Sequence, residues 1–531
     1  MASARLASLR SAARHPLAPA VLITVVSLVA HLWRLGLRPL AHDEAIDAWF
    51  SWQAGRGDVM RYDPVYHGPL RFYLEGIVLH VFGTGAGWAR LVAALAGVAS
   101  TAIIASARAT LGRIGAPVAA LVFTFSPTVL TVTRTGREDS LTALVSLGLL
   151  LVVSFLLTKP RPWHVIAGGA LLACSWAIKE TTFLFGFVAC WFFIAGAVIA
   201  WRSPTGRCRA AVQRIGALGR PPWVWSLTIF LVVFMVVFTS FFRYPGGIES
   251  GFVDGVQYWW SQHDVRRGGQ PWFFYLTIYG AYEWLLIGLA TVGLIVVVRR
   301  RSLVGLWFAT MWLGQVVIYA WAGEKFAWLA LHPLVPAVLL AGIGAQAIVD
   351  RVAALGTQRV LSAQRLLAGA FAGALALTAV IAVRPAITHG ADPRELLVTV
   401  QTSVDVPPIV EQLRAGQRDG TINTIAVDQR GGGSWPWAWY LNDHDFSGVS
   451  YVDLVDGELP EGFDAYILDG AQGPPVVPEG FVAVEFRLRE WWVPDYDNVS
   501  VGDVFTWLLT RETWNDTGSY PQYLVIRTPS N

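Results

Sequence analysis

The sequence predicts an α-helical polytopic membrane protein that carries an α/β domain near its C-terminal end. Of its 531 residues, 54% are hydrophobic and only 15% are charged, which is more apolar surface than compact soluble cores can bury. The apolar residues gather in runs of about 18–22, the length that crosses about 30 Å of hydrocarbon. Beyond residue 384 these runs become short and the chain becomes acidic, so the membrane part is expected to end there.

Eleven apolar segments are expected to span the membrane and to form one transmembrane module over residues 1–384. The first segment is too long for a signal peptide, and no convincing small-residue cleavage site follows it before His42. It is therefore expected to remain as an anchor. The expected spans lie near 17–37, 88–107, 114–133, 141–158, 163–178, 183–201, 223–242, 276–298, 303–321, 329–349 and 366–384.

The distribution of Lys and Arg predicts the orientation of these spans. The segment before the first span carries three arginines and no acid, which places it in the cytoplasm. Five later loops then also face the cytoplasm, and all five are basic. Their basic residues are Arg108, Arg113, Lys159, Arg161, Arg202, Arg207, Arg209, Arg214, Arg220, Arg299, Arg300, Arg301, Arg351, Arg359 and Arg365. A multi-pass plasma-membrane protein is expected, with its C-terminal domain outside the cytoplasm.

Residues 385–531 are expected to form this extracytoplasmic α/β domain. Strand-like apolar runs begin at Thr424, Ala465, Phe481 and Tyr523, and helical stretches lie between some of them. A group of tryptophans at positions 435, 437 and 439 has two interpretations. It packs the core of the domain, or it forms a platform for a glycan or for docking onto the membrane part.

A first acidic pair, Asp43 and Glu44, follows the first span in an outer loop over residues 38–87. Charge beside hydrocarbon is costly and usually has a function. In a helix, Asp43 and Asp47 would share one face. A carboxylate at the bilayer edge can act as a general base or bind a divalent cation. The alternative is a loop whose charges are simply solvated at the interface.

A second acidic pair, Glu138 and Asp139, lies in the turn at 134–140 together with Arg134 and Arg137. The predicted topology puts this pair on the same outer face as the first. Hard carboxylate oxygens suit Mg²⁺ or Mn²⁺, and no other cofactor is expected. The two arginines could instead neutralise the carboxylates, so the sequence leaves the metal hypothesis open.

Other outer-face residues carry charges or rings suited to phosphate or sugar. Basic side chains that could hold a phosphate occur in the loop at 243–275 and after Glu324, although each could be an ordinary loop charge. His67 follows Tyr66 in a turn shaped by proline and glycine, and a lone histidine is more often structural. Lys179 and Glu180 form a pair at the outer end of a helix.

These motifs together resemble the GT-C glycosyltransferases, polytopic enzymes that use polyprenyl-phosphate sugars. The run from His67 to Tyr73 resembles the His-Pro-Pro-Leu-Tyr-Tyr element of the protein O-mannosyltransferase and aminoarabinose transferase branch. The second acidic motif resembles that of the same branch. The run that begins at Glu324 resembles its Glu-x-Arg-Tyr-Leu-Leu-Pro element, with Lys325 in place of Arg.

A closer resemblance is to a prokaryotic family that is labelled flippase-activity-associated in archaeal N-glycosylation. The motifs His42-Asp43-Glu44-Ala45, Tyr62 to Pro69 and Gly323-Glu324-Lys325 carry it. It covers roughly residues 17–350, and the tail more loosely.

The resemblance implies an inverting glycosyltransferase. Its donor would be a polyprenyl-phosphate sugar, and its acceptor a glycan, lipid or protein; membrane lipid is a further partner and nucleic acid is not. Asp43 would be the base with Glu44 as its alternate, and Glu138 and Asp139 would orient the acceptor or a metal. The residues expected at the donor phosphate are Lys325, Arg243, Arg266 and Arg137. Those expected around the sugar are Tyr66, His67, Lys179, Glu180 and Glu324.

Two other functions remain open. The protein could be a non-catalytic accessory that helps a lipid-linked sugar cross the bilayer, but a transporter should carry polar residues near mid-membrane on several helices. The expected spans are nearly free of charge inside, which favours a site at the surface. A glycan-binding or scaffold subunit is the third option, and it leaves Asp43 and Glu138 unexplained.

Overall fold

The computed structural model describes residues 17–203, 205–355, 357–442, 444–454, 459–471 and 473–528. The chain folds into two compact units made of interleaved segments. The first unit contains the chain up to Trp33 and the segments Gly57–Leu74 and Arg90–Thr388. The second contains Arg34–Arg56, Glu75–Ala89 and the chain from His389 onwards. The first outer loop is therefore divided between the two units.

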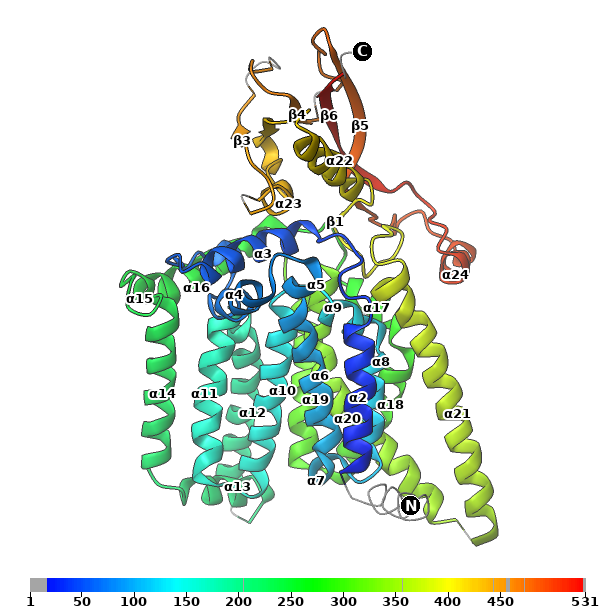
Figure 1. The fold of residues 1–531 in the computed structure, drawn as a ribbon. Coiled ribbons are helices and arrows are strands. Elements are labelled where there is room, and N and C mark those ends of the chain that lie inside the picture. The colour runs from blue at the N-terminus through cyan, green and yellow to red at the C-terminus, as the bar shows by residue number, and fades with distance from the viewer. Residues whose placement is uncertain are drawn as a thin grey trace, which may run out of the picture. The chain divides into compact units, whose positions relative to one another are not determined.

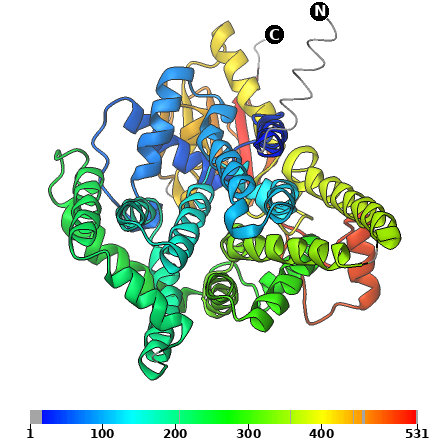
Figure 2. The ribbon, with the colours of Figure 1, turned by 90° about the horizontal axis from the view of Figure 1, so that it is seen from below.

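The first unit is a bundle of apolar helices, which Figure 1 shows along their length and Figure 2 shows end-on. Within the described residues, six segments are long and apolar enough to cross a membrane, or up to eight if each of two bent helix pairs is one span. The six are α10 (Asp139–Thr158), α12 (Thr182–Arg202), α14 (Pro221–Phe238), α19 (Leu303–Trp321), η4–α20 (Ala327–Ala353) and Val360–Thr388, which includes most of α21 (Thr357–Val383).

The bent pairs and the shorter helices fill the remaining expected spans. The pair α8 (Gly115–Phe125) and α9 (Pro127–Thr133) bends by 62°, and the pair α17 (Phe274–Tyr282) and α18 (Trp284–Arg300) bends by 104°. Shorter apolar helices are α2 (Ala18–Leu32), α6 (Leu91–Ser106) and α11 (Pro162–Ile178). Each of the eleven expected segments therefore contains a helix, although length and composition alone do not fix the number of spans.

Local sequence explains where the helices around the site begin. Ser126 leaves the helical conformation because the next residue is Pro127. Its hydroxyl then caps α9 by accepting a hydrogen bond from Val129 N at 3.1 Å. Pro162 starts α11 in the same favoured first-turn position. The break before α9 sends this short helix toward the turn that carries Glu138.

Glycines let the central helices approach closely. A Cβ atom at Gly293 of α18 would collide with the carbonyl oxygen of Leu340 in α20, and one at Gly344 of α20 would collide with that of Leu289. Small residues at such crossings allow backbones to pack against each other inside a membrane. The faces that meet there are almost entirely buried.

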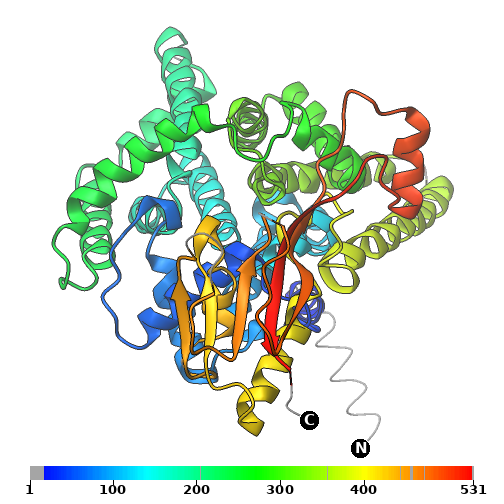
Figure 3. The same ribbon diagram turned by 90° about the horizontal axis from the view of Figure 1, so that it is seen from above.

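The second unit contains a six-stranded mixed sheet, seen from above in Figure 3. Strand order is β1-β5-β6-β4-β2-β3, with β2 parallel to β3 and β4 and the other pairs antiparallel. All four predicted strand runs are strands, whereas β1 and β3 were not predicted. The strands are β1 (Gln401–Thr402), β2 (Ile425–Asp428), β3 (Val449–Val452), β4 (Ala465–Asp469), β5 (Phe481–Trp491) and β6 (Gly518–Arg527).

Helices of the second unit come from both parts of the chain. Three helices belong to the C-terminal part of the chain. They are α22 (Val406–Asp419), the short α23 (Trp437–Tyr440) and α24 (Val501–Thr510). From the first outer loop come α3 (His42–Gly55), α5 (Ala86–Ala89) and the end of α4 (Leu70–Phe82).

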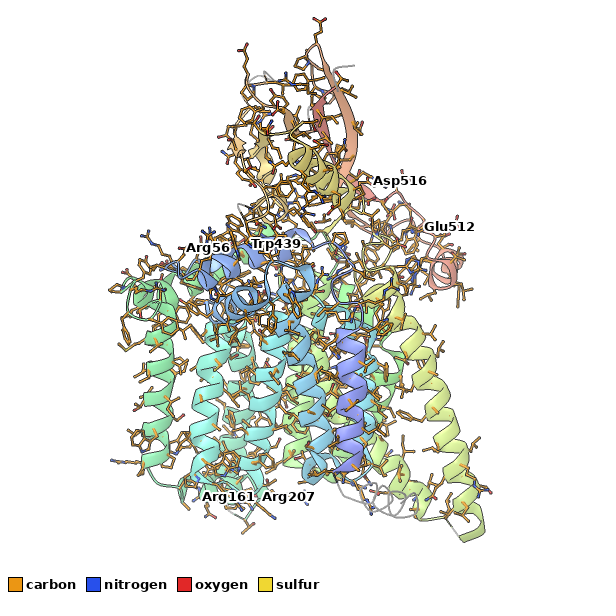
Figure 4. The ribbon with its side chains drawn as sticks, in the orientation of Figure 1. Arg56, Arg161, Arg207, Trp439, Glu512 and Asp516 are labelled. Carbon is orange, nitrogen blue, oxygen red and sulfur yellow. The ribbon has the colours of Figure 1, made fainter. Side chains whose placement is uncertain are left out.

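The tryptophan group packs in two different places of this unit. Trp437 is fully buried in the core on one face of the sheet, and its indole N–H donates to Gln522 Oε1 at 2.8 Å. Trp439, labelled in Figure 4, packs with Ala45 and Trp52 of α3. Both side chains are therefore used for packing, and the second of them joins the C-terminal sequence to the first outer loop.

Further short elements connect the longer ones. They are η1 (Pro64–Tyr66), α7 (Arg108–Leu111), α13 (Arg207–Gly216), α15 (Gly247–Glu249), η2 (Ser250–Asp254), α16 (Gly255–Ser261), η3 (Gln262–Val265), η5 (Arg384–Thr388) and η6 (Arg430–Gly432).

Candidate active site

A buried charge cluster surrounds the second acidic pair in the first unit. Lys179 follows α11, and its ammonium lies 2.7 Å from Glu138 Oε1 and 2.6 Å from Asp139 Oδ1. Arg137 lies 3.1 Å from Glu138, and Arg71 of α4 lies 3.3 Å from its other oxygen. All five side chains are at least nine-tenths buried. Such a group is stable only when its charges are paired.

The pairing sets the ionisation of the cluster. Burial alone would raise the pKa of Glu138, but Arg137, Lys179, His67 and Arg71 outweigh it and hold that pKa well below its usual range. Burial alone would lower the pKa of Lys179. The charges of Asp139 and Glu138 outweigh this effect and raise that pKa above its ordinary value. Glu138 is therefore a carboxylate at neutral pH, and Lys179 keeps its positive charge.

His67 joins this cluster to Glu180. Its Nδ1 lies 2.9 Å from Glu180 Oε2 and its Nε2 lies 3.4 Å from Glu138 Oε1. Its ring stacks on Trp259 with centroids 5.0 Å apart, and its backbone has a φ of +65°, a conformation that non-glycine residues seldom adopt. Tyr62 donates a hydrogen bond to Glu180 at 2.6 Å. The imidazole is thus held between two carboxylates.

Neighbouring helices fix the other side of the acidic pair. His332 of α20 lies 2.8 Å from Asp139 Oδ1 through its Nε2. Arg134 donates to the carbonyl oxygens of Ala30, His31 and Trp33 at 2.9, 2.7 and 2.8 Å. That contact ties the acidic turn to the end of α2, so the position of the turn depends on several helices.

The cluster does not suit a divalent cation. The carboxylate oxygens that would have to bind Mg²⁺ or Mn²⁺ are occupied by Lys179, Arg71 and Arg137. Across the part of the chain that the structure describes, no three His, Cys, Asp or Glu side chains are grouped to hold a metal ion. Neutralisation by basic residues, the alternative left open by the sequence, is what the geometry supports.

A cavity of about 420 Å³ opens beside this cluster. Its wall is mainly apolar and aromatic, and its polar end includes His67, Lys179 and Glu324, three of the five residues expected around the sugar. Such a shape suits a ligand with an apolar body and a polar head. The other lining residues are Thr181, Phe183, Leu184, Trp259, Trp260, Ser261, Gln262, Tyr319, Trp321, Ala322, Gly323 and Leu329.

The residues expected at a donor phosphate have different surroundings. The Lys325 amide donates to the Arg267 carbonyl at 3.0 Å, which joins the 323–325 turn to the 243–275 loop, and the Lys325 ammonium donates to the Ala322 carbonyl. Burial lowers the pKa of Lys325, and the Arg266 charge lowers it further. Arg243 instead donates to the Gly57 carbonyl at 2.8 Å, where it holds a loop.

The remaining expected residues have simpler contacts. Tyr66 ends the short helix η1 and does not line the cavity. The Arg137 guanidinium lies 4.5 Å from the centre of the Trp328 ring. It therefore stacks on an aromatic face while it pairs with Glu138.

The first acidic pair belongs to the second unit, and its two members differ in exposure. Glu44 is 1% exposed and caps α3 by accepting the Ala41 amide at 2.9 Å. It also pairs with Arg38 at 3.2 Å. Asp43 is partly exposed at the start of the same helix. The structure thus gives Glu44 a local structural role and leaves Asp43 as the accessible carboxylate of the pair.

Sequence reasoning missed three members of the site. Arg71 lies inside the quoted His67–Tyr73 run but received no role, although an arginine at the start of an apolar helix is itself a signal. Tyr62 likewise lies inside the quoted Tyr62–Pro69 motif but received no role, and Trp259 had no signal beyond its ring type. Their importance depends on contacts with residues far away in the sequence.

Comparison with known proteins adds family and fold information. Residues 66–213 match the family described as dolichyl-phosphate-mannose-protein mannosyltransferase, a range that contains most of the charge cluster. No curated protein matches the sequence.

Solved structures resemble the fold at low identity. ArnT from Cupriavidus metallidurans bound to undecaprenyl phosphate has a TM-score of 0.59 and 16% identity, over 96% of this chain and 98% of that chain. AglB, an oligosaccharyltransferase from Archaeoglobus fulgidus in complex with an inhibitory peptide and a dolichol-phosphate, has a TM-score of 0.50 and 14% identity, over 82% and 64%. The A. fulgidus oligosaccharyltransferase complex with Zn and sulfate has a TM-score of 0.51 and 12% identity, over 82% and 62%.

Proposed function

Because the chain has the GT-C fold of multi-pass membrane glycosyltransferases, we propose that it transfers a sugar from a polyprenyl-phosphate donor to an acceptor on the extracytoplasmic face. One observation carries the proposal: an aromatic cavity ends at the buried Lys179 ammonium and the His67 imidazole, beside Glu138. The apolar wall suits a lipid donor, and the cationic end suits its phosphate.

The charge cluster in this proposal serves to position positive charge. Glu138 and Asp139 fix Lys179 where the cavity ends, so no reorganisation is needed when phosphate charge develops on the leaving group. Lys325 and Arg266 supply further positive charge from the adjoining loop. We assign Arg243 to loop anchoring on the basis of its contact with Gly57.

The resemblance to the GT-C glycosyltransferases implies that the transfer is an inverting displacement. The acceptor oxygen forms a bond to the anomeric carbon as the bond from that carbon to the phosphate oxygen breaks. The acceptor proton passes to the Asp43 carboxylate, and polyprenyl phosphate leaves with the bonding electrons. Asp43 is preferred to Glu44 because Asp43 is partly exposed, whereas Glu44 is only 1% exposed.

The outer position of the site rests on the charge distribution. Arg161 precedes α11 and Lys179 follows it, so the basic loops and the charge cluster lie at opposite ends of this helix. Arg161 and Arg207 lie at the same end of the bundle (Figure 4). By the positive-inside rule that end faces the cytoplasm. Cysteines placed at 325 should then react with an impermeant reagent in intact cells, and cysteines at 209 should not.

The test is donor turnover by purified protein in liposomes. Labelled polyprenyl-phosphate sugars should be converted to polyprenyl phosphate, and the matching nucleotide sugars should not. Trp259→Ala should slow turnover, because Trp259 lines the cavity and stacks on His67. Trp163→Ala is the matched control, because Trp163 lies at the start of α11, whereas Lys179 and the cavity lie at the end of that helix. Trp163 is 54% exposed. Passage of a lipid-linked sugar across the bilayer without turnover would favour the accessory function instead.

A further inference from the structure

The sheet of the second unit contains a topological switch point. Strand β2 has β3 on one side and β4 on the other, and both are parallel to it. The chain therefore leaves β2 in one direction and returns on its other side for β4. In sheets of this kind ligands bind outside the carboxyl ends of the strands, where the connections diverge. Here that position lies between Asp428, the last residue of β2, and Asp469, the last residue of β4.

Paired charges and one aromatic ring occupy this edge of the sheet. The Asp428 side chain is fully buried and binds Arg430 through two oxygens, with Nη2–Oδ2 at 2.7 Å and Nε–Oδ1 at 3.0 Å. Tyr520 of β6 donates to Asp469 Oδ1 at 2.8 Å. The Arg489 guanidinium of β5 lies 5.0 Å from the centre of the Tyr520 ring. Four strands thus bring hydrogen-bonding groups to one place.

The loop after β2 brings two glycines to this edge of the sheet. Gly431 and Gly432 have φ values of +59° and +78°, which favour glycine. A Cβ atom on Gly431 would lie 3.1 Å from the Tyr520 hydroxyl. The glycines therefore let the backbone pass close to Tyr520 without a side chain between the ring and a ligand.

A buried polar group beside the same edge lacks a partner. Gln522 follows Tyr520 by two residues on β6, so the two side chains share one face of the sheet. Gln522 is 0% exposed, and its Oε1 accepts from Trp437. Within the described residues, its Nε2 has no hydrogen-bond partner. Buried polar groups are nearly always satisfied, so Gln522 is an exception among the buried groups on this face of the sheet.

We propose that this sheet edge, formed by Asp428, Arg430, Asp469, Arg489 and Tyr520, binds one sugar residue of a neutral, hydroxyl-rich glycan acceptor. Carboxylates accept hydrogen bonds from sugar hydroxyls and guanidinium groups donate to them, while the Tyr520 ring offers an apolar face. The hydrogen bond from Arg430 to Asp428 raises the pKa of Arg430, and the charges of Asp428, Asp469 and Asp453 raise it further. Three carboxylates therefore act at this edge against two guanidinium groups, so a phosphate or another anion is disfavoured.

The edge also bears on the proposed base. Burial lowers the pKa of Arg489, and the carboxylate charges of Asp43 and Asp469 oppose that shift. Asp43 is thus close enough to the sheet edge for its charge to act there. The identification of the bound glycan as the acceptor rests on the proposed function. Glycan binding at this edge does not depend on that function.

The test is equilibrium binding to the intact protein in detergent. The probes are fluorescently labelled maltotriose, mannotriose and chitotriose, with inorganic phosphate as a competitor. At least one trisaccharide should bind wild type, and Asp469→Asn should weaken it roughly ten- to a hundredfold through loss of a charged hydrogen bond. Asn keeps the size of the side chain and an acceptor for the Ala471 amide, which lies 2.9 Å from Asp469.

Two further variants keep the test decisive if Asp469→Asn folds poorly. Tyr520→Phe keeps the ring and removes only the hydroxyl, so it should weaken binding less. Arg527→Gln is the control, because Arg527 makes an exposed ion pair with Asp464 at the opposite edge of the same sheet; it should bind like wild type. No binding by any trisaccharide, binding unaffected by Asp469→Asn and Tyr520→Phe, or displacement by phosphate would overturn the inference.

The glycan-binding and donor-turnover assays, made on the same purified protein, distinguish this inference from the proposed function. If a trisaccharide binds through Asp469 but no polyprenyl-phosphate sugar is turned over, the glycan site stands and the glycosyltransferase proposal fails. If the donor is turned over but no trisaccharide binds, the reverse holds.

Discussion

The two acidic pairs of the protein have similar sequences but opposite surroundings. Glu138 and Asp139 are completely buried, and basic side chains surround them. In the other pair Glu44 is committed to a helix cap and an ion pair, and Asp43 remains partly exposed. A buried, fully paired carboxylate is held ionised and positions its cations, whereas an accessible one can exchange a proton with a substrate. On this difference rests our proposal that one pair organises positive charge and the other performs acid–base chemistry.

The largest effect is expected from removing the cation of the buried pair. Lys179→Met leaves Glu138 and Asp139 buried with one positive charge fewer, which should destabilise the protein by about 3–5 kcal/mol. Thermal unfolding in detergent measures this. Lys159→Met is the matched control, because Lys159 is exposed at the end of α10, and it should stay within about 0.5 kcal/mol of wild type. Equal stability of the two variants would contradict the account of the cluster.

A second prediction concerns pH and Glu138. The cluster lowers the pKa of Glu138, so ionised Glu138 stabilises the folded protein above the unfolded pKa, and this contribution is lost as the pH falls through the folded pKa. Wild type should therefore lose stability on acidification more steeply than Glu138→Gln, although the variant starts lower at pH 7. Unfolding temperatures measured from pH 7 down to about pH 2 give the slopes, because the loss continues below the unfolded pKa until the folded pKa is reached. Glu249→Gln, an exposed site in the same unit, should keep the wild-type slope.

A smaller effect is expected at the cap of α3. Glu44→Gln removes the charge that accepts the Ala41 amide and pairs with Arg38, so it should destabilise the protein by about 1–2 kcal/mol. Asp43→Asn should destabilise the protein less than Glu44→Gln, because Asp43 is partly exposed and Glu44 is buried. Parallel unfolding curves measure both. If Asp43→Asn proves the less stable variant, the assignment of structural and chemical roles within this pair is reversed.

The smallest effect is expected from Arg243. Its guanidinium holds the Gly57 carbonyl, so Arg243→Gln should change the donor KM no more than about twofold. Lys325→Gln removes a cation assigned to the phosphate and should raise the donor KM roughly tenfold, the effect of one charged hydrogen bond. Steady-state turnover with a labelled donor measures both values. A larger effect for Arg243 than for Lys325 would exchange their roles.

The elements could be predicted from the sequence because hydropathy and strand patterns are local. All eleven expected segments contain helices, and all four expected strand runs are strands. The turn with Glu138 was also recognisable, because carboxylates beside apolar helices are rare. The local pattern could not show which cations neutralise it: Lys179 and Arg71 reach Glu138 from about 41 and 67 residues away.

The division of the first outer loop was equally hidden. Trp439 packs against α3 although about 390 residues separate them, and no local pattern records such a contact. The contact of Arg243 was hidden for a similar reason, because its partner is a backbone carbonyl of another loop. Residue type suggested what these side chains can bind, and only the fold determines what they do bind.

Donor turnover by Asp43→Asn tests the central claim most directly. Purified wild type and variant would be placed in liposomes with a labelled polyprenyl-phosphate sugar, and the released polyprenyl phosphate would be measured over time. Loss of a general base should slow the variant by ~10²–10⁴-fold, with an unfolding temperature equal to that of wild type. Turnover of folded Asp43→Asn within a few-fold of wild type would contradict the claim that this accessible carboxylate carries the chemistry.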